Sequence, residues 1–366
     1  MPGKPPKTGR KPAGSRRRAV AAAAQPAAPQ ISDRRRVTSY DVAKRAGVSQ
    51  SAVSRCFTEG ASASSDLREK VMRAAEELGY RPNAIARGLI TRRSNLVAVV
   101  ISSRTNLYYP EVLFELTTRF EARGSRVLLF ALEHESDVDH VLDKVFSYQV
   151  DGVVAAARLS DAQVVQFERH GIPVVLYNRF ADRAPASSVC CDHLEYGHRL
   201  AERLVAAGHK SFGIIDSPAD SFVGIERIKG VRGVLKAHGF DAPSVRGDYG
   251  YESGGTALAE LLKKTRKRPA AVICANDAMA LGAIDYARNE LGLEIPKQLS
   301  IVGFDGIGPA YLAAYRLTTV RQPVRRMTEA AVSMLMERIE DPTLAPEKRM
   351  FSGDLVEGAS ARLGPA

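Results

Sequence analysis

The 366-residue chain has no tryptophan and only four cysteines, Cys56, Cys190, Cys191 and Cys274. These cysteines have neither CxxC spacing nor the density of a disulfide framework, which predicts a reduced protein of the cytoplasm. Because neighbouring strand residues point to opposite faces, Cys190 and Cys191 are poorly placed to share one metal ion. We therefore expect no metal and no cofactor.

Long apolar runs are also absent. No stretch reaches the roughly 18 residues that a membrane-spanning helix needs. Three arginines at 16–18 precede the apolar run 19–24, but this run is short, has no leucine and leads back to arginines. A secretion signal is therefore disfavoured, and residues 1–36 are expected to form an unstructured basic tail.

Sequence motifs of common enzymes are missing as well. No GxGxxG follows the first apolar strand-like run, and neither GxxxxGK[ST] nor GxSxG occurs. These motifs mark phosphate-binding loops and nucleophile elbows. The chain is therefore not predicted to be an enzyme.

The net charge of +11 is concentrated at one end of the chain. Residues 1–36 contain ten Lys or Arg and one Asp, and residues 37–94 contain ten Lys or Arg and six Asp or Glu. The remainder, 95–366, holds 32 basic and 34 acidic residues. A basic N-terminal quarter ahead of a nearly neutral remainder is typical of a protein that binds a polyanion at one end.

The segment Thr38–Arg55 is predicted to form two short helices joined at Gly47, the layout of a helix-turn-helix. Thr38 and Ser49 are suited to cap the two helix starts, and Gly47 can adopt the positive φ of a tight turn. Apolar residues recur on one side, where the helices would pack, at Val42, Ala43, Ala46, Val48, Ala52 and Val53.

A third helix is expected from about Ser65 to Leu78, with Val71, Ala74 and Ala75 on its buried face. The three helices would form an all-α headpiece over residues 37–81. Gly79 and Pro82 break the helical pattern, and residues 82–94 are expected to form a hinge helix or linker.

From Asn95 onward, apolar runs typical of buried strands alternate with helical patterns, which favours parallel sheets covered on both faces. The expected strands cover 96–102, 126–132, 150–157, 172–178, 188–192, 211–217, 270–276 and 299–305. Eight such strands favour two α/β lobes over one sheet. Since ligands bind beyond the carboxyl ends of parallel strands, the crevice between the lobes is the expected pocket.

Five segments stand out by their order and spacing: Tyr40-Asp-Val-Ala-x-x-Ala-Gly-Val-Ser49 with Val53-Ser-Arg55, Gly79-Tyr-x-Pro-Asn83 leading to Leu89, Ala275-Asn-Asp-x-Met-Ala-Leu-Gly282, Val302-Gly-Phe-Asp305, and Leu317-Thr-Thr-Val-x-Gln-Pro323. In this arrangement, which spans about residues 37–360, the chain resembles the lac repressor family of bacterial transcription regulators.

The resemblance implies a homodimer that reads a palindromic operator with two headpieces. It also implies that residues 95–366 form an effector-binding and dimerisation domain similar to periplasmic sugar-binding proteins, with parallel sheets in two lobes linked by three crossovers. The crossovers are expected near 192–194, 306–308 and 322–324. Lobe 1 would then comprise about 95–192 and 324–345, and lobe 2 about 193–306 and 347–362.

By matching positions, the resemblance assigns base reading to Gln50, Ser51 and Arg55 on the outer face of the second helix. The other implied DNA contacts, mostly to phosphates, are Thr38, Ser49, Ser54, Asn83 and Leu89. Helix capping alone is an equal alternative for Ser49. Leu89 matches a leucine that relatives wedge into the minor groove, and packing against a lobe is its alternative.

The resemblance also places seven residues in the pocket: Tyr108, Tyr109, Val223, Arg227, Tyr249, Asn276 and Asp305. Arg227 and Asp305 can bind hydroxyls or a carboxylate through charge-assisted hydrogen bonds, and Tyr249 offers a flat apolar face to a sugar ring. As alternatives, Asp305 would cap the segment that follows it and Tyr108 would be ordinary lobe surface. Ser221 and Val223 indicate no particular ligand.

These inferences predict a DNA-binding transcription regulator controlled by a sugar or sugar-like effector, with a repressor favoured and an activator left open. The alternative is an exported periplasmic sugar-binding receptor for transport, which would explain the two lobes but not the headpiece. No leucine heptad segment follows Arg362, so a dimer is expected and not a tetramer.

Overall fold

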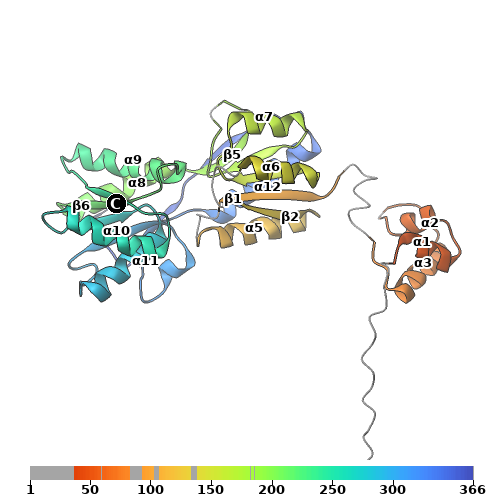
Figure 1. Ribbon diagram of the computed structural model, residues 1–366, viewed down its shortest axis with the longest axis horizontal. Helices are drawn as coiled ribbons and strands as arrows, with labels where there is room; N and C mark the ends of the chain where they lie inside the picture. The colour runs from red at the N-terminus through yellow and green to blue at the C-terminus, as the bar shows by residue number, and fades with distance from the viewer. Residues whose placement is uncertain are drawn as a thin grey trace, which may run out of the picture. The chain divides into compact units, whose positions relative to one another are not determined.

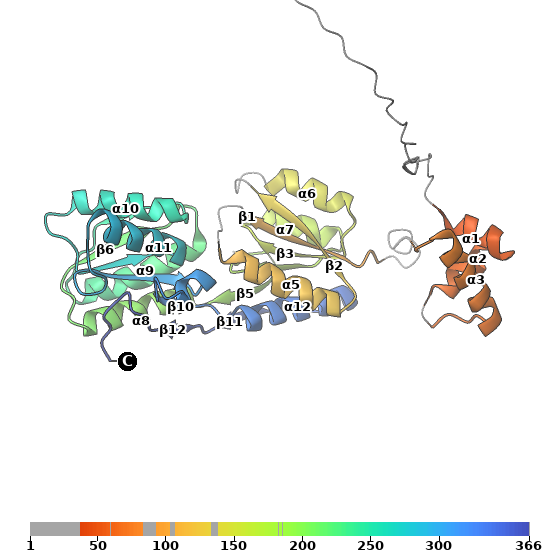
Figure 2. The same ribbon diagram turned by 90° about the horizontal axis from the view of Figure 1, so that it is seen from below.

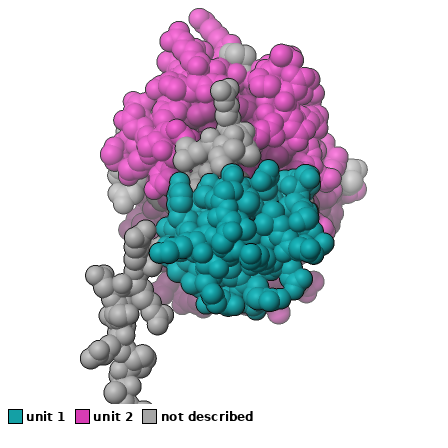
Figure 3. Space-filling view, turned by 90° about the vertical axis from the view of Figure 1, so that its right-hand side faces the viewer, with its two compact units in different colours: residues 1–83 teal, residues 84–366 magenta. Residues whose placement is uncertain are grey.

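The computed structural model describes residues 37–58, 60–82, 93–102, 107–132, 138–181, 183–184 and 186–365. The chain divides into two compact units, residues 1–83 and 84–366 (Figure 3). The basic tail 1–36 and most of the predicted hinge, with Asn83 and Leu89, lie outside the described residues. Within the described part of the chain, no helix is long and apolar enough to cross a membrane.

Three helices form the headpiece, as predicted: α1 (Ser39–Ala46), α2 (Gln50–Cys56) and α3 (Ser65–Leu78). At the start of α1, the Thr38 backbone N–H and hydroxyl donate to the Asp41 carboxylate at 2.8 and 2.7 Å. Gly47 ends α1 with a φ of +63°, a conformation that favours glycine. Ser49 then caps α2, because its hydroxyl accepts from the Ala52 N–H at 3.2 Å.

One apolar cluster holds the three helices together. Val42 of α1, Val53 of α2 and Val71 of α3 are completely buried. Cys56 belongs to the same cluster and packs as a small apolar residue. The opposite, outer face of α2 is therefore left to polar side chains.

Lobe 1 of the second unit is a six-stranded parallel sheet in the order β11-β5-β4-β3-β1-β2, of which β1, β2 and β5 are labelled in Figure 1. Successive residues of β1 (Leu96–Ser102) face opposite ways. Val97 and Val99 share an apolar cluster with α5 (Tyr109–Ala122) and α12 (Val324–Glu340). Ala98 and Val100 share another with α6 (Val138–Ser147) and α7 (Asp161–Arg169). The remaining strands are β2 (Arg126–Leu132), β3 (Gly152–Ala156), β4 (Val174–Tyr177), β5 (Ser187–Cys191) and β11 (Lys348–Phe351).

Lobe 2 repeats this design with the order β12-β10-β9-β8-β6-β7, in which only β12 is antiparallel to its neighbour; β6, β10 and β12 are labelled in Figure 2. Its strands are β6 (Phe212–Asp216), β7 (Ser244–Arg246), β8 (Ala271–Cys274), β9 (Ser300–Asp305), β10 (Thr318–Arg321) and β12 (Asp354–Val356). Its helices are α8 (His193–Ala206), α9 (Phe222–Ala237), α10 (Tyr251–Lys264) and α11 (Asp277–Asp285), followed by a π-helical turn (Tyr286–Glu290) and a 3-10 turn (Gly308–Tyr311).

Three crossovers link the lobes, and one of them differs from the prediction. The chain passes from β5 to α8 at Asp192, from β10 to α12 at 322–323, and from β11 to β12 at 352–353. The crossover expected near 306–308 is wrong, because β10 follows and pairs with β9 in lobe 2. Residues 348–351, assigned to lobe 2, instead form β11 beside β5 in lobe 1.

Helices α8 and α9 meet through two glycines. A methyl carbon on Gly197 would lie 2.1 Å from the Arg227 carbonyl oxygen, and one on Gly230 would lie 2.1 Å from the Leu194 carbonyl oxygen. Only a hydrogen atom fits at either position, so the two backbones touch. This close approach sets Arg227 beside His193, the first residue of α8, and so positions one wall of the pocket.

A buried carboxylate fixes the carboxyl end of β9. Asp277 accepts hydrogen bonds from the backbone N–H groups of Gly306 and Ile307 at 2.7 and 3.0 Å, and from the Thr319 hydroxyl at 2.5 Å. Burial and the charge of Asp305 raise the pKa of Asp277 to about 7, while the three donors oppose that rise. The contacts hold the backbone just after Asp305 in place.

Replacing Asp277 with alanine is expected to destabilise the fold. The substitution leaves two buried N–H donors without an acceptor, at a cost of about 1–3 kcal/mol each. Asp277→Asn keeps an acceptor oxygen for these donors, and its amide can donate to the Thr319 hydroxyl, so its loss should be smaller. Urea denaturation measures both; equal stability of Asp277→Ala and the wild type would contradict this role.

Two glycines of α9 provide a matched pair for the helix contact. Gly230→Ala should lower the free energy of unfolding by about 1–3 kcal/mol, because α8 must move away. At Gly233, three residues further along α9, an added methyl carbon meets nothing within 4 Å. Gly233→Ala should instead stabilise the protein by up to about 1 kcal/mol through helix propensity. Thermal denaturation that moves both variants in the same direction would refute this packing.

Candidate functional sites

The first candidate site is the outer face of α2 in the headpiece. Ser51 and Arg55 are exposed there, one helical turn apart. Among the described residues, nothing pairs with the Arg55 guanidinium, whereas Arg45 and Arg73 form ion pairs with Glu77 and Glu69. Its donors are therefore available to a partner outside the chain.

The other predicted contacts of the headpiece surround this face. Gln50 is half-buried, and its Nε2 donates to the Ser39 hydroxyl at 3.3 Å. Ser49 is exposed, with its hydroxyl 3.0 Å from that of Ser51, and Ser54 is half-buried. Thr38 is half-buried and its hydroxyl donates to Asp41. The DNA contacts assigned to all these residues remain predictions.

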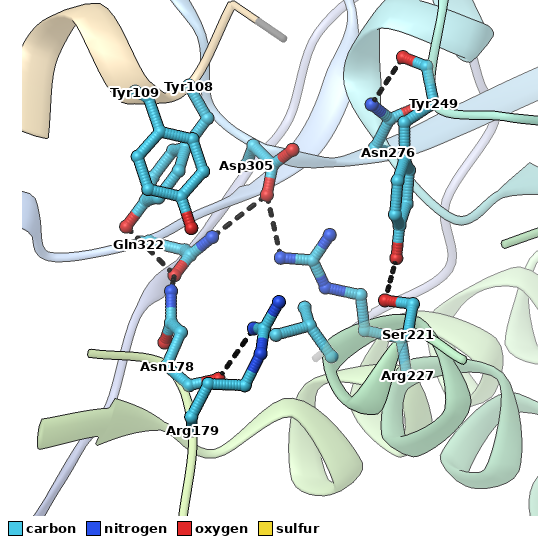
Figure 4. Close-up of a pocket in the computed structure, with 11 residues that line it drawn as sticks. Tyr108, Tyr109, Asn178, Arg179, Ser221, Arg227, Tyr249, Asn276, Asp305 and Gln322 are labelled. Atoms are coloured by element: carbon cyan, nitrogen blue, oxygen red, sulfur yellow. Dashed lines mark hydrogen bonds and ion pairs between the residues drawn. The ribbon is translucent and has the colours of Figure 1, made fainter. Parts of the chain in front are cut away.

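The second candidate site is a pocket of the second unit that encloses about 410 Å³ of space, part of it open to solvent (Figure 4). All seven residues predicted for a pocket line it, and four others join them. The seven are Tyr108, Tyr109, Val223, Arg227, Tyr249, Asn276 and Asp305, and the four are Asn178, Arg179, Ser221 and Gln322. Residues of both lobes and of the second crossover thus meet at one place.

A buried ion pair forms the centre of the pocket. Arg227 is 2% exposed and its Nη2 lies 2.6 Å from Oδ1 of Asp305. Its Nη1 also donates to the Ala275 carbonyl oxygen at 2.8 Å, and its guanidinium carbon lies 5.2 Å from the centroid of the Phe304 ring. Removing one partner of a buried ion pair leaves an uncompensated charge and is strongly destabilising, so these contacts hold both side chains in one geometry.

The neutral ring of His193 contacts this ion pair through a hydrogen bond from Arg227. Burial, together with the positive charges of Arg227 and Arg179, lowers the pKa of His193 well below its usual range. The neutral ring accepts from Arg227 Nε at its Nδ1, at 3.4 Å, and donates from Nε2 to Asn178 Oδ1, at 3.3 Å. The hydrogen-bond pattern therefore assigns the Nε2–H tautomer.

Asp305 has an unusual backbone conformation. Its φ of +125° lies in a region that residues other than glycine rarely adopt. The bonds from Gly306 and Ile307 to Asp277 hold this turn. Strain of this kind persists at sites where the surrounding structure imposes it, and here it directs the Asp305 carboxylate toward Arg227 (Figure 4).

Gln322 joins the two lobes through its amide group. Its Nε2 donates to Asp305 Oδ1 of lobe 2 at 2.8 Å. Its Oε1 accepts from two side chains of lobe 1, Asn178 Nδ2 at 2.8 Å and the Tyr108 hydroxyl at 3.1 Å. Gln322 itself lies in the second crossover, so one side chain links the connecting segment to both walls of the pocket.

The remaining lining residues form a partly apolar wall. The rings of Tyr108 and Tyr109 meet edge to face, with centroids 5.5 Å apart. The Tyr249 hydroxyl hydrogen-bonds to the Ser221 hydroxyl, and its carbonyl accepts from Asn276 Nδ2 at 3.0 Å. Asn276 also caps α11 by accepting from the Met279 N–H. The pocket therefore combines flat aromatic faces with fixed polar groups, the usual make-up of a small-molecule site.

Sequence reasoning missed Asn178, Arg179 and Gln322. Asn178 and Arg179 directly follow β4, at the carboxyl edge where ligands bind parallel sheets, and this rule applied to every strand would have found them. Gln322 lies in the motif Leu317–Pro323, to which the sequence alone assigns no role.

Comparison with protein families identifies both units. Residues 38–83 match the family model of bacterial regulatory proteins of the lacI family, and residues 201–361 match a periplasmic binding protein-like domain. The first match contains the helix-turn-helix, and the second contains most of lobe 2 and the C-terminal elements.

Among curated relatives, the chain is 32% identical to the HTH-type transcriptional repressor PurR of Proteus mirabilis over 335 residues, which cover 90% of this chain and 98% of that protein. It is 30% identical to catabolite control protein A of Priestia megaterium, over 84% of this chain and 94% of that protein.

Solved structures agree with these matches. The lac repressor dimer bound to operator and the anti-inducer ONPF superimposes with a TM-score of 0.79 at 26% identity, covering 89% of this chain and 99% of that chain. A complex of the transcriptional regulator CelR with cellobiose gives a TM-score of 0.66 at 29% identity, covering 89% of this chain and all of that chain. The chain belongs to the lacI family of bacterial regulatory proteins.

Proposed function

We propose that this chain is a sequence-specific DNA-binding repressor whose affinity for its operator is controlled by a small molecule bound between its two lobes. One observation carries the proposal: a single polar network, centred on Gln322, joins both lobes around a pocket in a chain that also has a helix-turn-helix headpiece. A ligand that enters this network contacts both lobes at once.

The headpiece is proposed to read DNA with α2. Arg55 is the principal base reader, since a free guanidinium can form two parallel hydrogen bonds to guanine O6 and N7. Ser51 and Gln50 lie beside it, and Thr38, Ser49 and Ser54 contact phosphates near the helix starts. Asn83 and Leu89 are proposed to extend the contact into the hinge.

A homodimer on a palindromic operator follows from two considerations. Helix α2 has only seven residues, so one headpiece can contact only a few bases. Two headpieces on two half-sites are therefore needed to select a single site. The lac repressor of the comparison is itself a dimer bound to operator. An operator partner also implies a location in the cytoplasm.

The effector is proposed to be a sugar or a sugar derivative. Hydrogen-bonding groups of fixed orientation and the flat faces of Tyr108 and Tyr249 suit a ring that bears several hydroxyls, and CelR was solved with cellobiose. Ligand binding would change operator affinity through its different affinity for two lobe arrangements, with a coupling of typically 1–3 kcal/mol. Neither catalysis nor exported transport is proposed, because the headpiece match and the relatives named above are those of regulators.

The proposal is tested by selecting double-stranded DNA from a random library with the purified full-length protein. A palindromic consensus is expected. Sugars, sugar acids, sugar phosphates and nucleobases are then screened for a rise in melting temperature, and each hit is tested for a change in operator affinity, expected to be roughly 5- to 150-fold. Stabilisation by nucleobases alone would rule out the sugar preference, and no enrichment of any sequence would rule out the repressor.

Arg55→Ala should reduce affinity for the selected operator by about 1–3 kcal/mol, roughly 5- to 150-fold, while affinity for unrelated DNA changes little. Arg73→Ala is the matched control, because it removes the same charge from exposed α3, where Arg73 pairs with Glu69. Fluorescence anisotropy at one fixed salt concentration measures both affinities. An equal loss in the two variants would remove Arg55 from the list of base readers.

A further inference from the structure

The charges that line the pocket do not balance. Arg227 and Asp305 neutralise one another at 2.6 Å. The third ionic group of the lining is Arg179, and among the described residues it forms no ion pair. The lining therefore has one uncompensated positive charge.

Arg179 is buried and still has unused donors. Its side chain is nearly enclosed, with the whole residue 8% exposed, yet its one hydrogen bond within the described chain runs from Nη1 to the Asn178 carbonyl oxygen at 2.8 Å. In Figure 4 the side chain extends from the lobe 1 loop toward the middle of the pocket. A guanidinium has five N–H donors, so most of the Arg179 donors have no acceptor within the described chain.

A helix start adds to this positive end of the pocket. Ser221 and Val223, at the first turn of the 16-residue helix α9, line the same pocket as Arg179. The first N–H groups of a helix have no partner within the helix and carry a partial positive charge. Phe180, next to Arg179, contacts Phe222 of this turn with ring centroids 5.8 Å apart, so the two features lie together.

A neutral ligand would fit this arrangement poorly. When it covered Arg179, it would remove water from the guanidinium without supplying a counter-charge, and desolvating an unpaired charge is costly. A carboxylate or a phosphate would instead accept two parallel hydrogen bonds from the same group.

We propose that the effector of this pocket carries an anionic group, a carboxylate or a phosphate on a polyhydroxylated skeleton, and that Arg179 binds that group. Arg227, already paired with Asp305, is left to the hydroxyls. The inference rests on the proposed effector site and narrows its ligand class from sugars in general to sugar acids or sugar phosphates.

The experiment compares matched ligands on the full-length protein by isothermal titration at constant ionic strength. The sets are glucose, glucuronate and glucose 6-phosphate; galactose, galacturonate and galactose 6-phosphate; and ribose and ribose 5-phosphate. Inorganic phosphate serves as a probe of the anion site alone, through its effect on melting temperature. At least one anionic member should bind tenfold or more tightly than its neutral counterpart, and the better of the acid and the phosphate identifies the group.

Arg179→Gln should reduce the affinity for the anionic member roughly 10- to 100-fold, and it should leave the affinity for the neutral member unchanged or raise it, because no unpaired charge is then desolvated. Arg179→Lys should recover part of the loss. Arg246→Gln, which removes an exposed arginine of β7 outside this pocket, is the control and should change neither. Because each variant is judged by the ratio of two ligands, a general loss of folding does not imitate the result.

Two results would overturn the proposal. One is a neutral sugar that binds as tightly as, or more tightly than, its anionic counterparts. The other is a rise in melting temperature with inorganic phosphate that is no larger for the wild type than for the Arg179→Gln variant. If a neutral sugar binds and also shifts operator affinity, the proposed effector-controlled repressor stands and only the anionic ligand fails.

Discussion

The buried ion pair of Arg227 and Asp305 is the interaction on which the pocket depends. Neither charge is tolerable in the interior without the other, and their neighbours complete the arrangement: the Phe304 ring, the Ala275 carbonyl oxygen and the Gln322 amide. The fold reaches this geometry by close approach and strain. Glycines bring α8 and α9 into backbone contact, and the turn after Asp305 is held by hydrogen bonds to Asp277. A site built in this way has its polar groups oriented before a ligand arrives, which lowers the entropy cost of binding.

Much of the fold was predictable because its signals are local. A buried parallel strand such as β1 has an apolar run on both faces, and α1 and α2 are marked by their caps and by Gly47. The strands that escaped prediction are β7, β10, β11 and β12, each of three or four residues. A segment such as Lys348–Phe351 alternates exposed and half-buried residues, and only its pairing with β5 makes it a strand. Because β10 and β11 leave no clear signal in the sequence, one crossover is expected near 306–308, whereas the structure places it between β11 and β12 at 352–353.

The pocket was predictable to the extent that its residues lie in segments with recognisable patterns. Asn276 and Asp305 lie in such segments, whereas Arg227 was assigned by the resemblance alone, and the structure brings the three together. Asn178 and Gln322 are 144 positions apart in the chain, and no local sequence pattern predicts the hydrogen bond between their amides. Arg179 was hidden for a similar reason, because its importance lies in the lack of a nearby carboxylate among the described residues, which is a property of tertiary structure.

The same amide that escaped prediction makes the lobes sensitive to a ligand. Gln322 lies in a crossover segment and forms hydrogen bonds with side chains of both lobes. A ligand oxygen that hydrogen-bonds to one of these side chains would replace a contact between the crossover and a lobe by a contact between the lobe and the ligand. We infer that this replacement of Gln322 hydrogen bonds by ligand hydrogen bonds sets the arrangement of the lobes. A ligand shifts the equilibrium between two lobe arrangements only if its affinity for them differs. Because Gln322 contacts both walls of the pocket, a small molecule that binds beside it can produce such a difference with few contacts. An anionic group bound by Arg179 of lobe 1 would add to that difference where it also lies near the start of α9 in lobe 2.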